Sequence, residues 1–343
     1  MSEERVLLAH GDGGQLMAEL IERVFVSRLG TGEPPGDDSA PIETGEEEKR
    51  RRGEEGRLVF TTDAFVVEPI FFPGGDIGKL AVCGTVNDLA SAGARPLALS
   101  ASFILEEGLL ISDLERVVDS MATAAREAGV RVICGDTKVV PRGKADRLYI
   151  STSGVGEVPP GVSVSGSAAK PGDAVLVSGP VGDHGLAVLS QREGLEFESP
   201  ITSDCAPLNG LVAAVLEAVP GVHALRDPTR GGLATALNEI ARQSGVQIEI
   251  IEEAVRVRPA VAAACELLGL DPLYIANEGK MIVVAPSGAA EAALSAMRSH
   301  PLGGEAARIG EVTEGPSRVL LRTVLGTRRM LGRHVGEQLP RIC

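Results

Sequence analysis

Apolar residues along the chain follow two different spacings, and these spacings predict a mixture of strands and helices. Runs rich in Val, Ile, Leu and Phe predict strands over 58–67, 97–105, 130–134, 148–155, 174–178 and 281–285. Apolar positions three and four residues apart predict helices over 17–25, 77–93, 112–129 and 233–242, and another that starts at 182. A capping box (Ser112-Asp113-Leu114-Glu115) is expected to open the third of these helices.

A stretch rich in proline, glycine and serine, at 159–169, separates two patterned regions. A length of 343 residues agrees with two domains, each large enough for its own core. Residues 43–57 carry almost no apolar side chain, and we expect them to form a solvated loop. We therefore expect domains over 1–158 and 170–325, followed by a flexible tail over 326–343.

Charge and composition argue against several classes of protein. The net charge of −14 disfavours nucleic-acid binding because a polyanion would be repelled, and few aromatic rings are present for base stacking. No run is apolar and long enough to predict a signal peptide or a membrane span. The five cysteines form no CxxC pair, which fits free thiols in a reducing cytoplasm better than disulfides or a zinc site.

Four aspartates interrupt apolar or glycine-rich segments of the first half. They are Asp38 after a glycine, Asp63 in a strand, Asp88 in a helix and Asp136 at a strand end. One such residue is usually a surface or capping residue, but a buried carboxylate is costly unless it is paired or binds a cation. Four favour a divalent-cation site for a polyphosphate, since Mg²⁺ binds a few carboxylates together with phosphate oxygens. Asn87, next to Asp88, is also expected to have a buried polar role.

Two glycine-rich segments of the first half resemble phosphate-binding loops. Residues 10–14 (HGDGG) are either a flexible N-terminus or a lid whose backbone N–H groups fold over phosphates. Residues 74–80 (GGDIGKL) are not a P-loop, because the spacing is one residue short and Leu80 replaces the magnesium-binding Ser or Thr.

Three polar motifs of the second half are also candidates. Residues 226–232 (RDPTRGG) precede a helix and either bind an anion or form a tight turn with an internal Arg–Asp pair. Residues 277–280 (NEGK) form a polar turn that would deliver Glu278 to a cleft. In the motif at 182–185 (GDHG), we favour His184 as an ordinary polar residue at a helix start.

The printed sequence ends in Pro340-Arg341-Ile342-Cys343. A final cysteine has no residue after it, so its sulfur could enter a pocket of a partner or of its own chain, and the proline keeps the segment from forming a helix. The alternative is a frayed tail that happens to stop at a cysteine.

Taken together, these motifs resemble those of the HypE family of hydrogenase maturation factors, within the aminoimidazole-ribonucleotide synthetase (PurM-like) superfamily. The resemblance covers nearly the whole chain except 43–57, and the final PRIC distinguishes HypE from the rest of the superfamily. The motifs that carry it are HGDGG, GDDSA, TTDAF, FFPGGDIGKLAVCGTVNDLA, CGDTKVV, GDHG, RDPTRGGLA, NEGK and PRIC. The fold it implies is of the α/β (α+β) class: a PurM-like N-terminal domain whose strands form a β-barrel across a homodimer, then a C-terminal α+β domain and a flexible tail.

The resemblance also implies a reaction and partners. A carbamoyltransferase, HypF, loads a carbamoyl group onto the Cys343 thiol. ATP with Mg²⁺ then drives dehydration of the thiocarboxamide to a thiocyanate, and cyanide passes to iron on a HypC–HypD scaffold. The residues implied for metal are Asp38, Asp63, Asp88 and Asp136, and those implied for ATP also include Gly11, Gly13, Asn87, Gly135, Lys138, Asp227 and Arg230.

The matched motifs suggest roles for two further residues. Glu278 is the candidate base that removes the nitrogen protons. Lys138 is the candidate that holds the γ-phosphate or a developing oxyanion, although a structural Lys–Glu ion pair is the simpler interpretation.

Two other classes of protein stay open. A thiamine-monophosphate kinase of the same superfamily would share the acidic motifs but would not need an accessible final cysteine. A non-catalytic, thiol-bearing adaptor would not need the nucleotide motifs. A selenophosphate synthetase is disfavoured, because residues 10–14 contain no cysteine.

Overall fold

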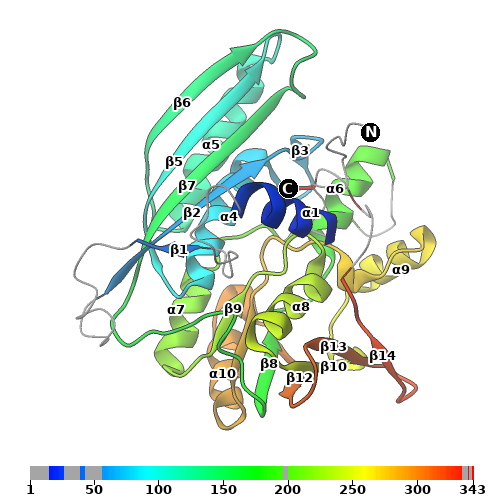
Figure 1. The fold of residues 1–343 in the computed structure, drawn as a ribbon. Coiled ribbons are helices and arrows are strands. Elements are labelled where there is room, and N and C mark those ends of the chain that lie inside the picture. Colours follow the sequence, from blue (N-terminus) through cyan, green and yellow to red (C-terminus); the bar gives the residue numbers. More distant parts are fainter. Residues whose placement is uncertain (1–14, 27–38, 43–55, 196–199, 334–338, 340–341) are drawn as a thin grey trace.

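The chain folds around two large β-sheets, one in each half, with helices packed against both, and the first half also contains a small two-stranded sheet (Figure 1). The computed structural model describes residues 15–26, 39–42, 56–195, 200–333, 339 and 342–343. Within these ranges, no helix is long and apolar enough to cross a membrane. The predicted loop at 43–57 and the glycine-rich segment at 10–14 lie almost entirely outside them.

The first sheet has five strands in the order β1-β2-β7-β5-β6 and is open, so within the described residues one chain does not close it into a barrel. Within the described part of this sheet, β5 and β6 are the only parallel neighbours. Helix α4 packs on one face of the sheet, and α5 packs on α4. The elements are α1 Gln15–Leu20, a π-helical turn Ile21–Val26, β1 Ala40–Pro41, β2 Arg57–Phe65, β3 Phe71–Phe72, β4 Gly75–Asp76, α4 Ile77–Ser91, β5 Arg95–Glu106, α5 Ile111–Glu127, β6 Val132–Val140 and β7 Leu148–Val158.

The second sheet has seven strands in the order β14-β13-β10-β12-β8-β11-β9. One face packs against α8, and the other packs against α7 and α10. Its strands are β8 Asp173–Val177, β9 Ala224–Arg226, β10 Gln247–Ile251, β11 Ile282–Pro286, β12 Ala307–Thr313, β13 Arg318–Arg322 and β14 Arg328–Met330. The helices are α6 Asp183–Glu193, α7 Asn209–Ala218, α8 Gly232–Ser244, α9 Pro259–Leu268 and α10 Ala290–Ser299, and short 3₁₀ turns cover Glu252–Ala254, Pro272–Tyr274, Ser287–Ala289 and Pro301–Gly303.

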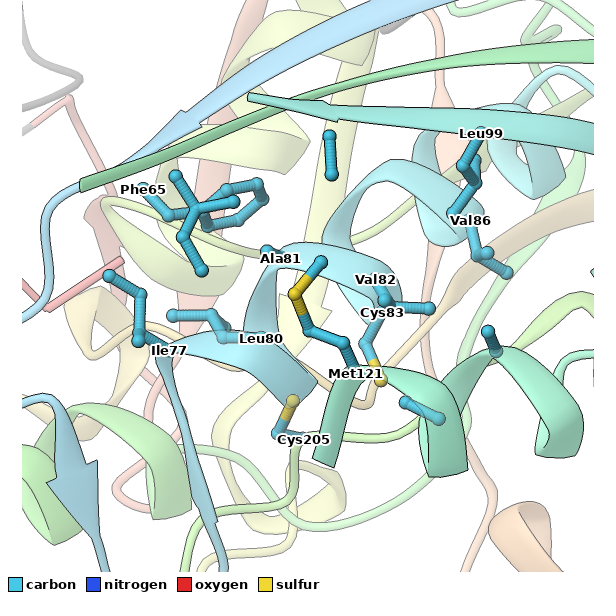
Figure 2. Packing of buried hydrophobic residues seen from close by; sticks show 14 of the residues in the cluster. Phe65, Ile77, Leu80, Ala81, Val82, Cys83, Val86, Leu99, Met121 and Cys205 are labelled. Atoms are coloured by element: carbon cyan, nitrogen blue, oxygen red, sulfur yellow. The ribbon is translucent and has the colours of Figure 1, made fainter. Parts of the chain in front are cut away.

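Helix α4 is the centre of the first core (Figure 2). Its own residues are mostly small or apolar, and nearly all of them are buried. Gly78 lets α5 approach closely, since a Cβ there would lie 2.3 Å from the carbonyl oxygen of Val117. The same core includes Cys205, Ala276 and Ile342 from the second half of the chain. Residues of the second half therefore complete the core of the first half.

Three local predictions need correction. Helix α5 begins after Leu110 and has no side-chain cap, so the capping box at Ser112 does not open it. Strand β6 continues through the GDTK motif to Val140, which places Asp136 in the middle of a strand and not at its end. Residues 328–330, predicted as the start of the tail, form β14, which pairs with β13.

Candidate active site at the junction of the two halves

Ile342 and Cys343 lie at the junction of the two halves (Figure 1), and their contacts with Val66, His184 and Arg230 are called the seat below. Arg230 donates a hydrogen bond from Nη2 to the Cys343 sulfur at 3.0 Å. The N–H of Val66, just after β2, donates to the main-chain oxygen of Cys343 at 3.3 Å. The Ile342 side chain is only 3% exposed and belongs to the first core. The described residues Ile342 and Cys343 are therefore packed, although sequence analysis placed them in a flexible tail.

His184 holds the segment next to the thiol. Its Nε2 lies 2.6 Å from the carbonyl oxygen of Ile342, and its Nδ1 lies 2.8 Å from Oγ of Ser203. The ring is fully buried and meets Phe72 edge-on. The sequence pattern favours an ordinary polar residue at a helix start and does not predict this contact. No local signal for it exists, because His184 and Ile342 are 158 positions apart.

Glu278 lies in the same site and is 2% exposed. Among the described residues, its Oε1 has no hydrogen-bond partner. Burial raises the pKa of Glu278 well above its ordinary value, and the neighbouring Cys343 and Cys205 raise it further. The Cys343 sulfur raises the pKa of Arg230, and Glu278 and Asp63 add to this effect against the opposing effect of burial. The NEGK turn was predicted to deliver Glu278 to a cleft; in the structure it places the side chain in a buried position beside the thiol.

Buried polar groups fix the NEGK turn that carries Glu278. Asn277 donates to the carbonyl oxygens of Pro228 and Ile275, both at 3.0 Å. The N–H of Glu278 donates to Asp204, which also binds Lys280 at 2.8 Å. Burial disfavours ionisation of Asp204, but Lys280 and this N–H lower the pKa of its carboxyl overall. The ion pair therefore stabilises the backbone of the turn.

Asn87 is fully buried, as the sequence predicted, and its partners come from the second half. Its amide donates to the carbonyl oxygens of Ala206 and Glu278, and its Oδ1 accepts from the N–H of Leu208 at 2.8 Å. These bonds occupy the side chain, so the structure gives Asn87 a positioning role between the halves. Asp227 is also buried, and it accepts from Ser91 of α4 at 3.3 Å.

Of the three predicted metal-binding aspartates that lie within the described residues, Asp63 and Asp88 lie on one side of the first sheet and Asp136 projects from the other. Asp63 lies near Arg230, and Asp88 accepts a hydrogen bond from Thr61 on the same face of β2 at 2.8 Å. Asp136 pairs in register with Ser102 and Ser151, whereas Asp63 is in register with Thr152, so the two aspartates project from opposite faces. The described residues contain no cluster of three or more His, Cys, Asp or Glu side chains suited to a metal.

Lys138 lies with Asp136 on the exposed strand β6. Its ammonium group binds the Asp136 carboxylate at 2.8 Å, and this contact lowers the pKa of Asp136. The structural ion pair that we considered for Lys138 is thus made with an aspartate two residues away and not with Glu278. Gly135 precedes this pair on the same strand, while Gly11, Gly13 and Asp38 lie outside the described residues.

The sequence and structure match known proteins over nearly the whole chain. Residues 36–158 match the AIR synthase related protein, N-terminal domain, and 170–321 match its C-terminal domain. The carbamoyl dehydratase HypE of Cupriavidus necator is 55% identical over 99% of this chain and 95% of its own. The HypE of Escherichia coli is 47% identical over 98% of this chain and 99% of its own.

Solved structures give the same result. HypE in a HypE–HypF complex has a TM-score of 0.85 and 49% identity over 92% of this chain and 99% of its own. HypE in complex with ATP has a TM-score of 0.81 and 49% identity over 99% of this chain and 100% of its own. A thiamine-monophosphate kinase from Aquifex aeolicus, 23% identical with a TM-score of 0.63, covers 91% of this chain and 97% of its own and shares the fold. The resemblance inferred from the motifs is confirmed, and the chain belongs to the HypE family of carbamoyl dehydratases, among the AIR synthase related proteins.

Proposed function

We propose that this protein uses ATP to dehydrate a carbamoyl group carried on the Cys343 thiol, producing a thiocyanate that supplies cyanide ligands for hydrogenase iron. The observation that carries the proposal is the seat of the sulfur, beside the Arg230 guanidinium and the buried Glu278. The relatives named carbamoyl dehydratase HypE support a dehydratase, and the HypE structure in complex with ATP supports the use of ATP.

The chemistry follows from the poor leaving ability of an amide oxygen. The carbamoyl oxygen attacks the γ-phosphorus of ATP, ADP leaves, and one nitrogen proton is lost, which leaves an S-bound imidate phosphate. A base then removes the second nitrogen proton, the electron pair forms the C≡N bond, and phosphate departs with the former carbamoyl oxygen. The products are the thiocyanate, ADP and phosphate.

Glu278 suits the base because burial raises its pKa and because its Oε1 has no hydrogen-bond partner in the described part of the chain. A carboxylate with a raised pKa accepts a proton more readily than an exposed one. Arg230 stabilises negative charge on the sulfur or on the neighbouring oxygen. Both side chains come from turns that buried hydrogen bonds hold in place.

The carboxylates of Asp63 and Asp88 fit an Mg²⁺ ion, since both are only partly buried and lie on the helix-facing side of β2. Bound there, the ion would neutralise charge on the transferring phosphoryl group. These two residues are therefore our candidates for direct metal contact.

We also propose a homodimer formed through the exposed strand β6. This strand is the edge of its sheet, and its apolar side chains Ile133 and Val139 are 63% and 68% exposed. Pairing with a second copy would cover them, and would let Lys138 and Asp136 complete the partner's site.

Mixing two inactive variants tests this arrangement. If Lys138 serves the Glu278 of the other copy, mixing Lys138→Ala and Glu278→Gln chains should restore about a quarter of the sites, because half the dimers are mixed and carry one intact site. No restoration in dimers shown to be mixed would place both residues in one chain's site or remove Lys138 from it.

The position of the thiol implies that the final segment moves when it meets partner proteins. Cys343 is only partly exposed here, so loading by a HypF-type carbamoyltransferase requires the end of the chain to leave this seat, and transfer to a HypC–HypD scaffold requires it again. The ten residues after Arg333 span roughly 35 Å when extended, which is enough for such a movement. A fluorophore at Val335 with a reference in the core should report a distance change when Mg·ATP is added to the loaded protein, and an unchanged distribution would contradict it.

The decisive experiment measures whether ATP is consumed only when Cys343 carries a carbamoyl group. We expect mass spectrometry to place the adduct on Cys343, and Cys343→Ala to bind nucleotide without turnover. An adduct on Cys83 or Cys134 would contradict the assignment. ATP consumption with a free small-molecule acceptor, unaffected by Cys343→Ala, would indicate a kinase instead.

A further inference from the structure

The motif Gly182-Asp183-His184-Gly185 contacts the end of the chain but has no part in the chemistry proposed above. It starts α6, where Gly182 has a φ of 94° and donates its N–H to Asn277 at 2.7 Å. We propose that this motif is the docking clamp for the thiol-bearing segment, with His184 as a positioning residue that binds the main chain of Ile342. The inference rests on the proposed function, because it assigns how the carrier thiol is presented to the reaction.

The hydrogen bonds of His184 determine its tautomer. The carbonyl oxygen of Ile342 only accepts, so the proton must be on Nε2. Burial lowers the pKa of His184, although Asp204 opposes this, and the neutral ring therefore accepts at Nδ1 from the hydroxyl of Ser203. Ser203 in turn accepts from the N–H of Cys205 at 3.1 Å and donates its own N–H to Pro73 at 2.8 Å. The ring is thus fixed by both halves of the protein.

Gly185 and its neighbours form an apolar contact surface for Leu339 of the same segment. A Cβ on Gly185 would lie 2.7 Å from Cγ2 of Ile275 and 3.1 Å from Cδ1 of Leu339. Leu339 packs against a cluster that includes Leu186, Val261 and Ile275. Any larger residue at 185 would occupy this contact surface, which gives a local reason for glycine at that position.

The contacts of the clamp determine which peptide segment it binds. Two of them are hydrogen bonds to the main chain: His184 donates to the carbonyl oxygen of Ile342, and the Val66 N–H donates to the main-chain oxygen of Cys343. Two others are apolar contacts of the side chains of Leu339 and Ile342, which are three positions apart. The structure selects a segment with apolar residues at these two positions, and the sulfur is then held at Arg230. Because small displacements of a reacting group slow catalysis strongly, the clamp should affect dehydration and not loading.

Three full-length chains, loaded with a carbamoyl group, test the role of the imidazole: the unaltered chain, His184→Ala and His184→Gln. The glutamine amide can donate from nearly the position of Nε2, whereas alanine cannot. We expect His184→Ala to slow single-turnover thiocyanate formation about tenfold to a hundredfold, as for loss of a buried hydrogen bond. His184→Gln should recover most of the rate, and the partner should load all three chains equally.

A second measurement does not depend on turnover. In ¹⁵N-histidine-labelled protein, the Nε2–H signal that disappears in His184→Gln belongs to His184, and it should be shifted downfield and protected from exchange. The tail substitutions Leu339→Ser and Ile342→Asp, made together, should abolish that protection.

The outcomes separate the clamp from the proposed reaction. If the unaltered, loaded chain makes no thiocyanate, the proposed function fails while the spectrum still tests the clamp. The clamp is overturned if His184→Ala turns over normally, if the glutamine and alanine variants are equally slow, or if the tail substitutions leave the His184 signal unchanged. If His184→Ala does not fold, the tail variant and the spectrum decide the question.

Discussion

Replacing Ile342 by alanine tests whether packing of the final segment sets the rate of the reaction. The isoleucine side chain is 3% exposed and lies against the first core, so the change removes three carbons from a buried environment. At roughly 0.8 kcal/mol per buried carbon, the loss is about 2.4 kcal/mol. This energy acts on the equilibrium between the seated and unseated segment, and corresponds to about a 50-fold shift.

The seated state must also offset the cost of ordering about ten residues, so it has little stability in excess. We therefore expect thiocyanate formation by the loaded Ile342→Ala protein to fall by up to about 50-fold in a single-turnover assay. Ile342→Val removes one carbon, about 0.8 kcal/mol, and is the matched control with an expected loss of about fourfold.

Mass spectrometry of the same samples gives the loaded fraction and the thiocyanate product. Loading should be unchanged in both variants, because in the proposed cycle the partner binds the segment after it has left its seat. A fully loaded Ile342→Ala protein that reacts at the wild-type rate would refute the argument, and would mean that the observed packing is not the reactive arrangement.

Three further predictions concern ionisable residues. Glu278→Gln should still bind ATP but form thiocyanate ~10²-fold more slowly, because the amide cannot accept the proton. The wild-type rate should rise with pH as the Glu278 carboxyl, whose pKa is raised, loses its proton, whereas the rate of the variant should not rise. A near-normal rate for the variant would mean that another group is the base. Burial raises the pKa of Asp183 from 3.8 in the unfolded chain to about 6 in the folded protein. Between pH 3.8 and 6 the folded state therefore binds more protons than the unfolded state, and the free energy of unfolding falls by about 3 kcal/mol as the pH rises through this range. Asp183→Asn should therefore raise the melting temperature near pH 8 but hardly near pH 4, and equal shifts at both would contradict this. Asp63→Asn and Asp88→Asn should each weaken Mg·ATP binding in calorimetry, and unchanged affinity in both would place the metal elsewhere.

Local pattern predicted most of the elements, because the period of apolar residues depends only on near neighbours. Helix α4 and strand β2 lie close to their expected ranges for this reason. The local pattern also indicated a buried position for Asn87 and a cleft position for Glu278, because polar residues stand out in apolar or turn segments. The local pattern could not identify the hydrogen-bond partners of these two residues. Asn87 binds groups 119 to 191 positions away, and only the packed structure brings them together.

The placement of Asp136 shows the same limit in a sheet. Its motif marked it as a ligand candidate, but the face from which a strand residue projects depends on register, and a shift of one residue reverses it. Here the register places Asp136 with Ser102 and Ser151, opposite the face of Asp63 that meets α4. A nucleotide site that used both aspartates from one chain would have to span the sheet. Either Asp136 and Lys138 have only their mutual ion pair, or they act on the site of another copy; the exposed apolar residues along β6 favour the second explanation.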